Sequence, residues 1–206
     1  MTRRPRVVVL DHGSGNLRSA QRALERVGAA VELTADRERA HTADGLVVPG
    51  VGAFATCMAG LTEVDGPRVI TERLTVDAPV LGICVGAQVL FESGTERGVT
   101  TPGLGLFSGE VTRLTGDRVP HMGWNTVMDT VGLPLLAGVP TDTRFYFVHS
   151  YAARPPVPDA AVATCEYGDS FVAAVSRGPL SATQFHPEKS GDAGLAVLSN
   201  WVRGLR

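Results

Sequence analysis

The feature that most constrains the fold is a short apolar stretch that runs into a cysteine framed by two glycines. Residues 79–83 form an apolar run typical of a buried strand, and the residues after Cys84 show the apolar spacing of a helix. Gly82 and Gly86 flank the cysteine. A sharp turn from strand to helix brings backbone segments close together, which favours residues without side chains on both flanks. The pattern therefore predicts an elbow that presents Cys84 at a helix N-terminus, where the partial positive charge favours a thiolate. A buried cysteine that only fills the core is the alternative.

The first half of the chain alternates between strand and helix patterns. A helical pattern at residues 17–27 stops at Gly28, and Pro49 is expected to end the third strand. Strands of nearly continuous apolar character separated by helices predict a doubly wound α/β fold with a mostly parallel sheet. The strands before Cys84 are expected at residues 6–11, 31–34, 45–48 and 79–83.

Ligands of such sheets bind beyond the carboxyl ends of the strands. Asp11, Pro49 and Cys84 each lie at the end of an expected strand. We therefore expect three loops to converge on one site.

The second half is richer in strand patterns, and a helix is expected near its end, at residues 193–202. The chain has 206 residues, the size of one ordinary domain, so we expect residues 1–206 to form a single domain with added antiparallel strands in the second half. The expected strands of this half lie at residues 109–114, 124–128, 144–151, 161–167, 171–176 and 180–186.

Composition argues against several classes of partner. The 19 basic and 21 acidic residues are nearly balanced and not clustered, so neither nucleic acid nor an anionic membrane is expected as a partner. No apolar segment is long enough to cross a membrane, and the N-terminal apolar run is too short for a signal peptide. Three widely spaced cysteines fit neither a disulfide framework nor a zinc site, so we expect no metal, no cofactor and a cytoplasmic location.

A cysteine nucleophile needs a base, and the base needs an orienting group. Among the five histidines, His186 ends an apparent strand and begins the sequence His-Pro-Glu. Pro187 biases His186 toward an extended conformation, so Glu188 can reach one ring nitrogen while the other faces the sulfur. The alternative for His-Pro-Glu alone is a strand end followed by a turn. Because the acid follows the histidine, the order differs from that of the α/β-hydrolases.

The loop around Val51 is the candidate for an oxyanion donor. Gly50 and Gly52 allow the backbone N–H of Val51 to face the site, and the amide of Val85 is the expected second donor. Because glycine tolerates both signs of φ, this peptide can also lie turned away until something moves it. A tight strand-to-helix turn is the alternative interpretation.

Several motifs together carry a resemblance to a known family. Gly-Ile-Cys-Val-Gly-Ala-Gln with His-Pro-Glu resembles the class I (triad) glutamine amidotransferases. Asp-His-Gly-Ser-Gly-Asn-Leu-Arg-Ser, Pro-Gly-Val-Gly, His-Met-Gly-Trp-Asn, Tyr-Phe-Val-His-Ser-Tyr and Phe-His-Pro-Glu-Lys-Ser narrow it to the glutaminase subunits of imidazole glycerol phosphate synthase, an enzyme of histidine biosynthesis. The resemblance covers essentially the whole chain and implies a flavodoxin-like class I glutaminase fold.

The resemblance assigns roles position by position. It implies Cys84 as the nucleophile, His186 as the acid and base, and Glu188 as the orienting group. The amides of Val51 and Val85 would form the oxyanion hole. Residues around the bound glutamine would be Gly50, Gly52, Gln88, Glu96, His149, Ser150 and Tyr151. Residues at or near the partner face would be Asn16, Met122, Trp124, Tyr146 and Lys189.

The resemblance also implies the reaction. The thiolate would attack the side-chain amide of glutamine and form a γ-glutamyl thioester, which water would hydrolyse to glutamate. The ammonia would pass to a TIM-barrel cyclase subunit, bound as a heterodimer, which makes imidazole glycerol phosphate and aminoimidazole carboxamide ribotide. Three positions depart from the family pattern: His12 replaces a tyrosine, and Val85 and Ala87 replace a leucine and a methionine. His12 puts in doubt any partner contact made by a phenol there.

Three alternatives remain open from sequence. The chain could be the glutaminase component of another amidotransferase, such as pyridoxal phosphate synthase or anthranilate synthase. It could be a non-catalytic subunit that keeps the fold, or a cysteine hydrolase of another α/β class that takes its acid from upstream. Separately, Trp124 could be a core aromatic and Lys189 a solvated charge.

Overall fold

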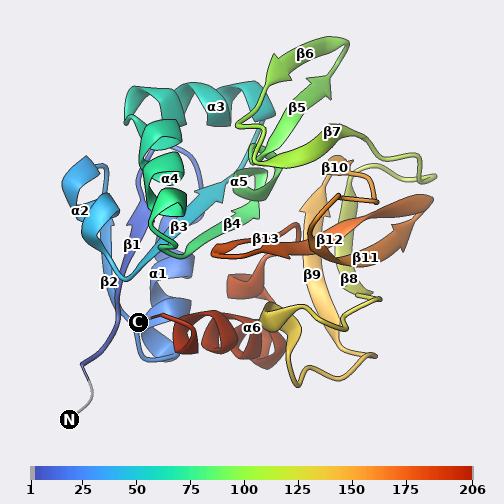
Figure 1. Ribbon diagram of the computed structural model, residues 1–206. Coiled ribbons are helices and arrows are strands. Elements are labelled where there is room, and N and C mark those ends of the chain that lie inside the picture. The colour runs from blue at the N-terminus through green and yellow to red at the C-terminus, as the bar shows by residue number, and fades with distance from the viewer. Residues whose placement is uncertain (1–2, 206) are drawn as a thin grey trace.

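The structure is a computed structural model that describes residues 3–205 (Figure 1). Its helices are α1 (Leu17–Arg26), α2 (Arg37–Thr42), α3 (Phe54–Glu63), α4 (Gly66–Thr75), α5 (Val85–Gln88) and α6 (Gly191–Arg203), with 3-10 turns at Pro134–Leu136 and Pro187–Lys189. Its strands are β1 (Arg6–Leu10), β2 (Ala30–Thr34), β3 (Gly45–Gly50), β4 (Val80–Cys84), β5 (Phe91–Glu96), β6 (Val99–Pro102), β7 (Phe107–Arg113), β8 (His121–Thr126), β9 (Arg144–His149), β10 (Tyr151–Ala153), β11 (Ala161–Tyr167), β12 (Asp169–Arg177) and β13 (Leu180–Thr183).

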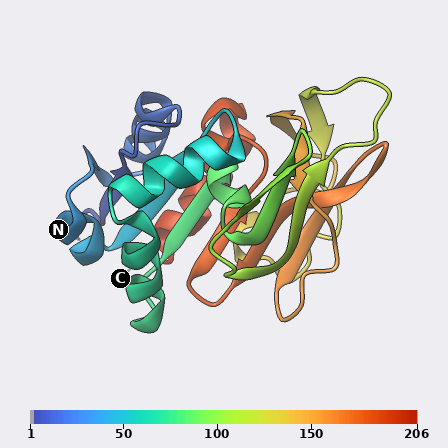
Figure 2. The same cartoon turned by 90° about the horizontal axis from the view of Figure 1, so that it is seen from above.

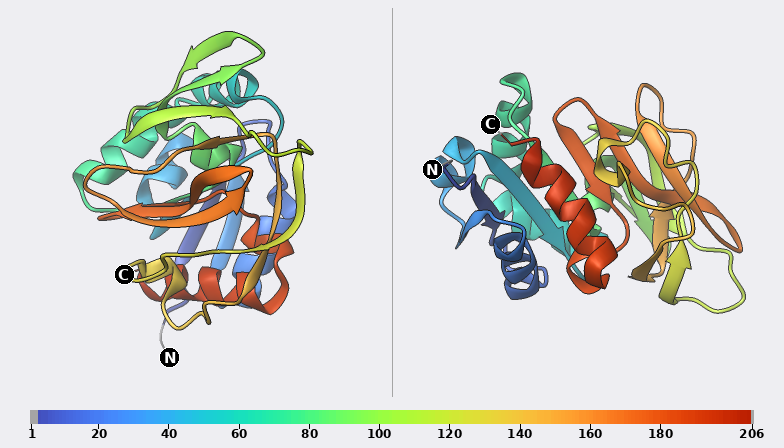
Figure 3. Two further views of the ribbon diagram at one scale, coloured as in Figure 1. Left: turned by 90° about the vertical axis from the view of Figure 1, so that its right-hand side faces the viewer. Right: turned by 90° about the horizontal axis from the view of Figure 1, so that it is seen from below.

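A seven-stranded sheet in the order β11-β12-β13-β4-β3-β1-β2 forms the centre of the molecule. The strands from β13 to β2 are parallel, and every residue of β3 and β4 is buried, as expected of strands covered on both faces. Helices α1 and α6 pack together on one face, and α3 and α4 lie on the other (Figure 3). The predicted α/β class with a mostly parallel central sheet is therefore confirmed.

The added strands gather at one end of this sheet (Figure 2). Strands β11 and β12 extend it antiparallel, while β10-β7-β5-β6 and the β8–β9 ribbon form two smaller sheets. The predicted strand at residues 144–151 divides at Ser150, because β9 pairs with β8 whereas β10 pairs with β7. The β5–β6 hairpin was not predicted, since its sequence is mostly polar.

Strand β3 continues through Pro49 to Gly50, so the prediction that Pro49 ends it is wrong. Its neighbour β1 pairs with it only as far as Val47, so nothing on that side requires an N–H from residue 49. On the other side Pro49 still pairs in register with Ile83 of β4. The extra length carries the chain directly to the Val51 loop.

The helix after Cys84 is shorter than its apolar pattern predicts. Helix α5 has four residues, and the chain then turns into β5. Val89, Leu90 and Phe91 are buried, so the apolar run fills the core at the junction instead of extending the helix. The short helix leaves Gln88 close to Cys84, and both residues line the same cavity.

Candidate active site

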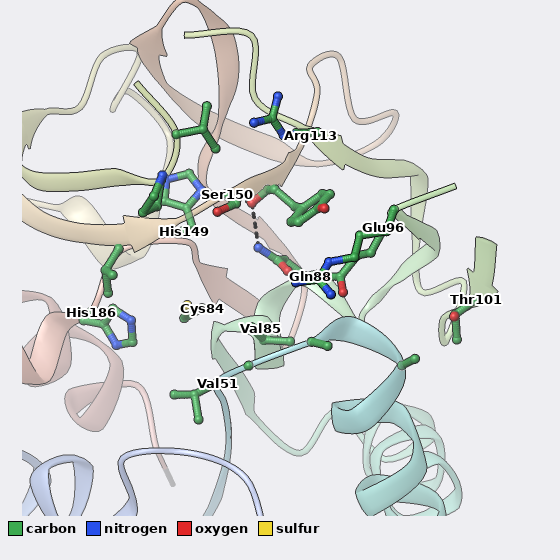
Figure 4. Close-up of a pocket in the computed structure, with 18 of the residues that line it drawn as sticks. Val51, Cys84, Val85, Gln88, Glu96, Thr101, Arg113, His149, Ser150 and His186 are labelled. Atoms are coloured by element: carbon green, nitrogen blue, oxygen red, sulfur yellow. Dashed lines mark hydrogen bonds between the residues drawn. The ribbon is translucent and has the colours of Figure 1, made fainter. Parts of the chain in front are cut away.

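The carboxyl ends of β1, β3 and β4 meet at one edge of the central sheet, as predicted. Ser14, after β1, contacts Val51, after β3, and the ring Nε2 of His12 lies 2.6 Å from the carbonyl oxygen of Pro49. Figure 4 shows Val51, Cys84 and Val85 grouped at this edge. His12 is buried, and its ring packs between these loops.

Cys84 lies on the predicted elbow. Its backbone has φ +56° and ψ −114°, a conformation that a residue with a side chain rarely adopts. A Cβ at Gly82 would come within 2.7 Å of the Gly86 carbonyl oxygen, and one at Gly86 within 2.0 Å of the Val48 carbonyl oxygen. Both flanking positions therefore require glycine, for the reason that the sequence suggests.

His186 and Glu188 form a buried pair. The ring Nδ1 lies 2.8 Å from Oε1 of Glu188, and the two side chains are only 3% and 2% exposed. The backbone N–H of His186 donates to the carbonyl of Tyr146, and the hydroxyl of Ser190 donates to the carbonyl of His186, which fixes the ring's position. The contact comes from the 3-10 turn that begins at Pro187, since β13 ends three residues before His186.

The pKa of His186 is set by competing effects. Burial alone disfavours the charged ring, but hydrogen bonds to Cys84 and Glu188 outweigh it and raise the pKa to about 9. Because Nδ1 is bonded to Glu188, Nε2 is the nitrogen left for the sulfur. The raised pKa favours the imidazolium, the form of the ring that can stabilise a thiolate and supply a proton.

The Val51 peptide is not turned toward the sulfur in this structure. Its N–H donates to the hydroxyl of Ser14 at 3.1 Å, and the same hydroxyl donates to the Val51 carbonyl at 2.8 Å. The orientation expected of an oxyanion donor is therefore not the one observed. Gly50 is buried against α5, where a Cβ would come within 2.4 Å of the Gly86 nitrogen, so its role is close packing beneath the site.

A cavity of about 820 Å³ opens above Cys84 and His186. Glu96 and Arg113 supply charges of opposite sign to its wall (Figure 4). Oε1 of Glu96 accepts a hydrogen bond from the backbone N–H of Phe54 at 3.1 Å, which holds the carboxylate in place. The predicted substrate residues that line the cavity are Gly52, Gln88, Glu96, His149, Ser150 and Tyr151, and the lining that sequence reasoning missed includes Arg97, Thr101, Arg113 and Val119.

A line of buried polar side chains runs along the wall. His149 donates through Nδ1 to the carbonyl of Tyr151 at 2.9 Å, so its Nε2 accepts from Nδ1 of His121 at 3.1 Å. Burial lowers the pKa of His149 to about 3 and that of His121 to about 4, so both rings are neutral. Two further buried contacts were missed from sequence: Gln88 with Gln184, and Gln184 with the Cys84 sulfur.

The β8–β9 ribbon is apolar on both faces. Phe145 and Phe147 point inward, whereas Met122 and Trp124 are 63% and 53% exposed. Trp124 pairs in register with Tyr146, and their rings lie 5.9 Å apart in an edge-on arrangement. Trp124 is therefore a surface aromatic and not a core residue.

The remaining predicted residues take simpler positions. Lys189 is exposed and lines the cavity, and Asn16 is the partly buried residue that precedes α1. Cys57 and Cys165 are buried free thiols, in agreement with a packing role. Within residues 3–205, no cluster of side chains suited to a metal ion is present. No helix in that range has the length and apolar character needed to span a membrane.

Comparison with known proteins assigns the family. Residues 8–204 match the family "Glutamine amidotransferase class-I". The imidazole glycerol phosphate synthase subunit HisH of Mycobacterium bovis is 63% identical over 201 residues, which cover 97% of this chain and 98% of that protein. The HisH subunit of Nocardia farcinica is 58% identical over the full length of both chains.

Solved structures support the fold independently. The structure of PurLQS from Thermotoga maritima aligns with a TM-score of 0.77 at 18% identity, covering 98% of this chain and 99% of that chain. At this identity the likeness concerns the fold alone, and it agrees with the sheet described above. With the near full-length match to HisH, these comparisons confirm the resemblance that the sequence motifs carry: the chain belongs to the class-I glutamine amidotransferase family and, within it, to the HisH subunits of imidazole glycerol phosphate synthase.

Proposed function

We propose that this chain hydrolyses glutamine to glutamate and ammonia through Cys84, His186 and Glu188, and passes the ammonia to a cyclase subunit in histidine biosynthesis. The observation that carries this proposal is the geometry at the sheet edge. A cysteine on a strained elbow lies beside a histidine that is itself held by a buried carboxylate. We place the reaction in the cytoplasm, where three free buried thiols remain reduced.

The three groups divide the chemistry in the usual way for a cysteine nucleophile. The Cys84 thiolate attacks the side-chain amide carbon of glutamine, and the His186 imidazolium protonates the departing ammonia. The resulting γ-glutamyl thioester is hydrolysed by water that His186 deprotonates. Glu188 keeps the ring in the tautomer that points Nε2 at the sulfur and stabilises its positive charge.

The cavity wall suits a zwitterionic amino acid. Glu96 offers a carboxylate to the substrate's ammonium group, and Arg113 offers a guanidinium to its carboxylate. Both hydrogens of the Gln88 amide are used, by Tyr151 and Gln184, so its Oε1 remains to accept from the substrate amide. His149 and Ser150 complete this wall.

The Val51 peptide acts as a switch in this scheme. In the structure Ser14 holds its N–H, so the backbone amide of Val85 is the donor already near the nucleophile. When the peptide turns, Val51 adds a second donor, which typically contributes about 2.7–4 kcal/mol to transition-state stabilisation. The partner biases the peptide toward that orientation, so glutamine is not hydrolysed wastefully by the free subunit.

The exposed ribbon beside the cavity is the docking surface for the cyclase. Met122, Trp124 and Tyr146 form an apolar face on β8 and β9, and Lys189 lies at the mouth of the cavity. Aromatic residues of this kind dominate the binding energy of many interfaces. Asn16, which precedes α1, is proposed to lie near the partner face as well.

The test is ammonia release from glutamine, measured with and without the cyclase subunit loaded with its nucleotide ligand. We expect little turnover by the free subunit, a large increase in the loaded complex, and none above background in Cys84→Ala. Ammonia release that survives Cys84→Ala contradicts the catalytic assignment. Equal turnover with and without the partner contradicts the switch and leaves the nucleophile unaffected.

A further inference from the structure

A buried amide that the reaction scheme does not use lies against the nucleophile. Gln184 follows β13 and is 4% exposed. Its backbone N–H donates to the carbonyl of Ala173 at 2.8 Å, which holds the chain in place beyond the end of the strand. Its side-chain Nε2 lies 3.7 Å from Sγ of Cys84.

The orientation of this amide follows from a single main-chain oxygen. The carbonyl of Tyr151 can only accept, and the side-chain amide of Gln88 lies 2.7 Å from it, so the nitrogen of Gln88 faces that carbonyl. The same nitrogen lies 2.9 Å from the amide of Gln184, which must then present Oε1. With Oε1 directed at Gln88, the N–H groups of Gln184 face the Cys84 sulfur.

We infer that Gln184 is a catalytic residue that donates a hydrogen bond to the thiolate of Cys84. The inference rests on the proposed role of Cys84 as the nucleophile. A hydrogen bond to an ionised acceptor is stronger than one between neutral groups, so the contact stabilises the thiolate over the thiol. An amide N–H is too weakly acidic to transfer its proton, so it stabilises the sulfur without protonating it.

The other groups that face the sulfur do not replace this donor. His186, from the segment after β13, holds a proton that the reaction consumes, and His149 and Glu188 lie behind it. Cys57 approaches from α3, but burial raises the pKa of its thiol to about 12, so it stays neutral. His186 gives its proton to ammonia and takes another from water during each turnover, whereas the amide of Gln184 keeps its hydrogens throughout, so Gln184 is a donor to the sulfur at every stage.

The test is the pH profile of Cys84 alkylation by iodoacetamide in the full chain, read by mass spectrometry of the Cys84 peptide. Buried Cys57 and Cys165, with pKa values of about 12, do not compete. In Gln184→Met, which keeps the side-chain length but removes the donor, we expect the midpoint of the profile to rise by about one pH unit. Alkylation at neutral pH should slow by up to about tenfold.

Thr183→Val is the matched control. Thr183 is the buried last residue of β13, and its hydroxyl donates to the carbonyl of Phe185 at 3.0 Å, so the variant also loses a buried hydrogen bond. It does not contact the sulfur, and we expect its alkylation midpoint to match the wild type.

Coincident profiles for Gln184→Met and wild type overturn the inference, as does an equal shift in Thr183→Val. If Gln184→Met does not fold, Gln184→Leu removes the same donor with a different side-chain shape. An NMR titration of the Gln184 side-chain amide in the wild type needs no variant. The chemical shift of this amide should change with pH at the same midpoint as alkylation. A chemical shift that does not change with pH contradicts the hydrogen bond. If Cys84 were not the nucleophile, the Cys84→Ala variant would still release ammonia from glutamine. That failure of the proposed function is therefore distinguishable from a failure of the inference about Gln184.

Discussion

The imidazole of His186 and the carboxylate of Glu188 lie 2.8 Å apart, and solvent reaches almost none of either side chain. The second carboxylate oxygen, Oε2, is buried and has no hydrogen-bond partner among residues 3–205. The pair therefore depends on one contact, and a change at Glu188 acts mainly through the histidine.

The first prediction concerns Glu188→Gln in the complex with the cyclase. The amide keeps the shape but loses the charge, so the pKa of His186 should fall and the proton for ammonia should become less available. We expect ammonia release to fall by about 10²–10⁴-fold, the usual contribution of an acid–base group. The pH–rate profile measures the effect, with the exposed Glu63→Gln as a control. An unchanged rate and profile would exclude the orienting role.

The second prediction is a pH dependence of stability. The folded pKa of His186, about 9, exceeds its ordinary value of 6.5, so the protonated ring stabilises the fold fully below pH 6.5, and this contribution is lost as the pH rises through 9. We expect the free energy of unfolding to lose on the order of 3 kcal/mol across this window. Urea denaturation at several pH values tests it. A loss of equal size in Glu188→Gln would contradict the assignment to this pair.

The third prediction concerns Ser14→Ala. The variant removes the hydroxyl that holds both the N–H and the carbonyl of Val51, so the peptide can turn more freely toward the site. We expect ammonia release by the free subunit to rise by up to about thirtyfold, because two hydrogen bonds of about 1 kcal/mol each are lost. The rate of the loaded complex should change little. Ser19→Ala, on α1, is the control. If the rate of the free subunit does not rise in Ser14→Ala, the hydrogen bonds of Ser14 do not hold the Val51 peptide away from the site.

The fourth prediction concerns Trp124→Ala. Trp124 is exposed on the ribbon, so its loss should leave the fold intact but weaken binding to the cyclase subunit. We expect a cost of about 2 kcal/mol, which is about thirtyfold in Kd. Isothermal titration calorimetry measures this, with Val76→Ala as a control, because Val76 is an exposed apolar residue just after α4. If both variants bind the cyclase subunit with equal affinity, Trp124 is not part of the interface.

The fifth prediction concerns Arg73→Met. Arg73 is completely buried on α4, and its guanidinium donates to the carbonyls of Ala40, His41, Ala43 and Pro79, each at 2.9 Å. It thereby caps the end of α2, and its loss should cost about 3 kcal/mol or more by leaving these carbonyls unpaired.

Arg68→Met, on the same helix, is the matched control for that measurement. Arg68 is exposed and pairs with Glu72 on the surface, so its loss should cost less than about 0.5 kcal/mol. Urea denaturation compares the two variants. Equal losses would show that the buried contacts of Arg73 add nothing to stability.

The parallel half of the fold could be predicted because its strands are continuous apolar runs. The Cys84 elbow was equally clear, since both flanking glycines are required by close backbone contacts. The β5–β6 hairpin was not predicted, because its polar residues show no alternation of apolar and polar side chains. Pairing of β5 with β7 stabilises it instead. The strand expected at residues 144–151 divides at Ser150 because β9 and β10 pair with strands of different sheets. Pairing of this kind cannot be predicted from the local sequence pattern.

In the site, His-Pro-Glu predicted the His186–Glu188 contact, although a 3-10 turn and not an extended strand produces it. Gln184 and Ser14 were missed because their roles arise from long-range contacts, with Cys84 and Val51 respectively. A glutamine or a serine beside a motif is too common to signal a contact of this kind. Arg73 was missed because its isolated positive charge looks like a surface residue in sequence.

The carbonyl oxygen of Tyr151 receives hydrogen bonds from both His149 and Gln88. Through His149 it is joined to the strand pair that carries Trp124, and through Gln88 and Gln184 to the sulfur of Cys84. This atom lies just after the point where the chain leaves one small sheet for another. A sideways displacement of β9 would therefore strain both hydrogen-bond chains at once, so a docking event at the outer ribbon has a short, largely buried route to the sulfur of Cys84.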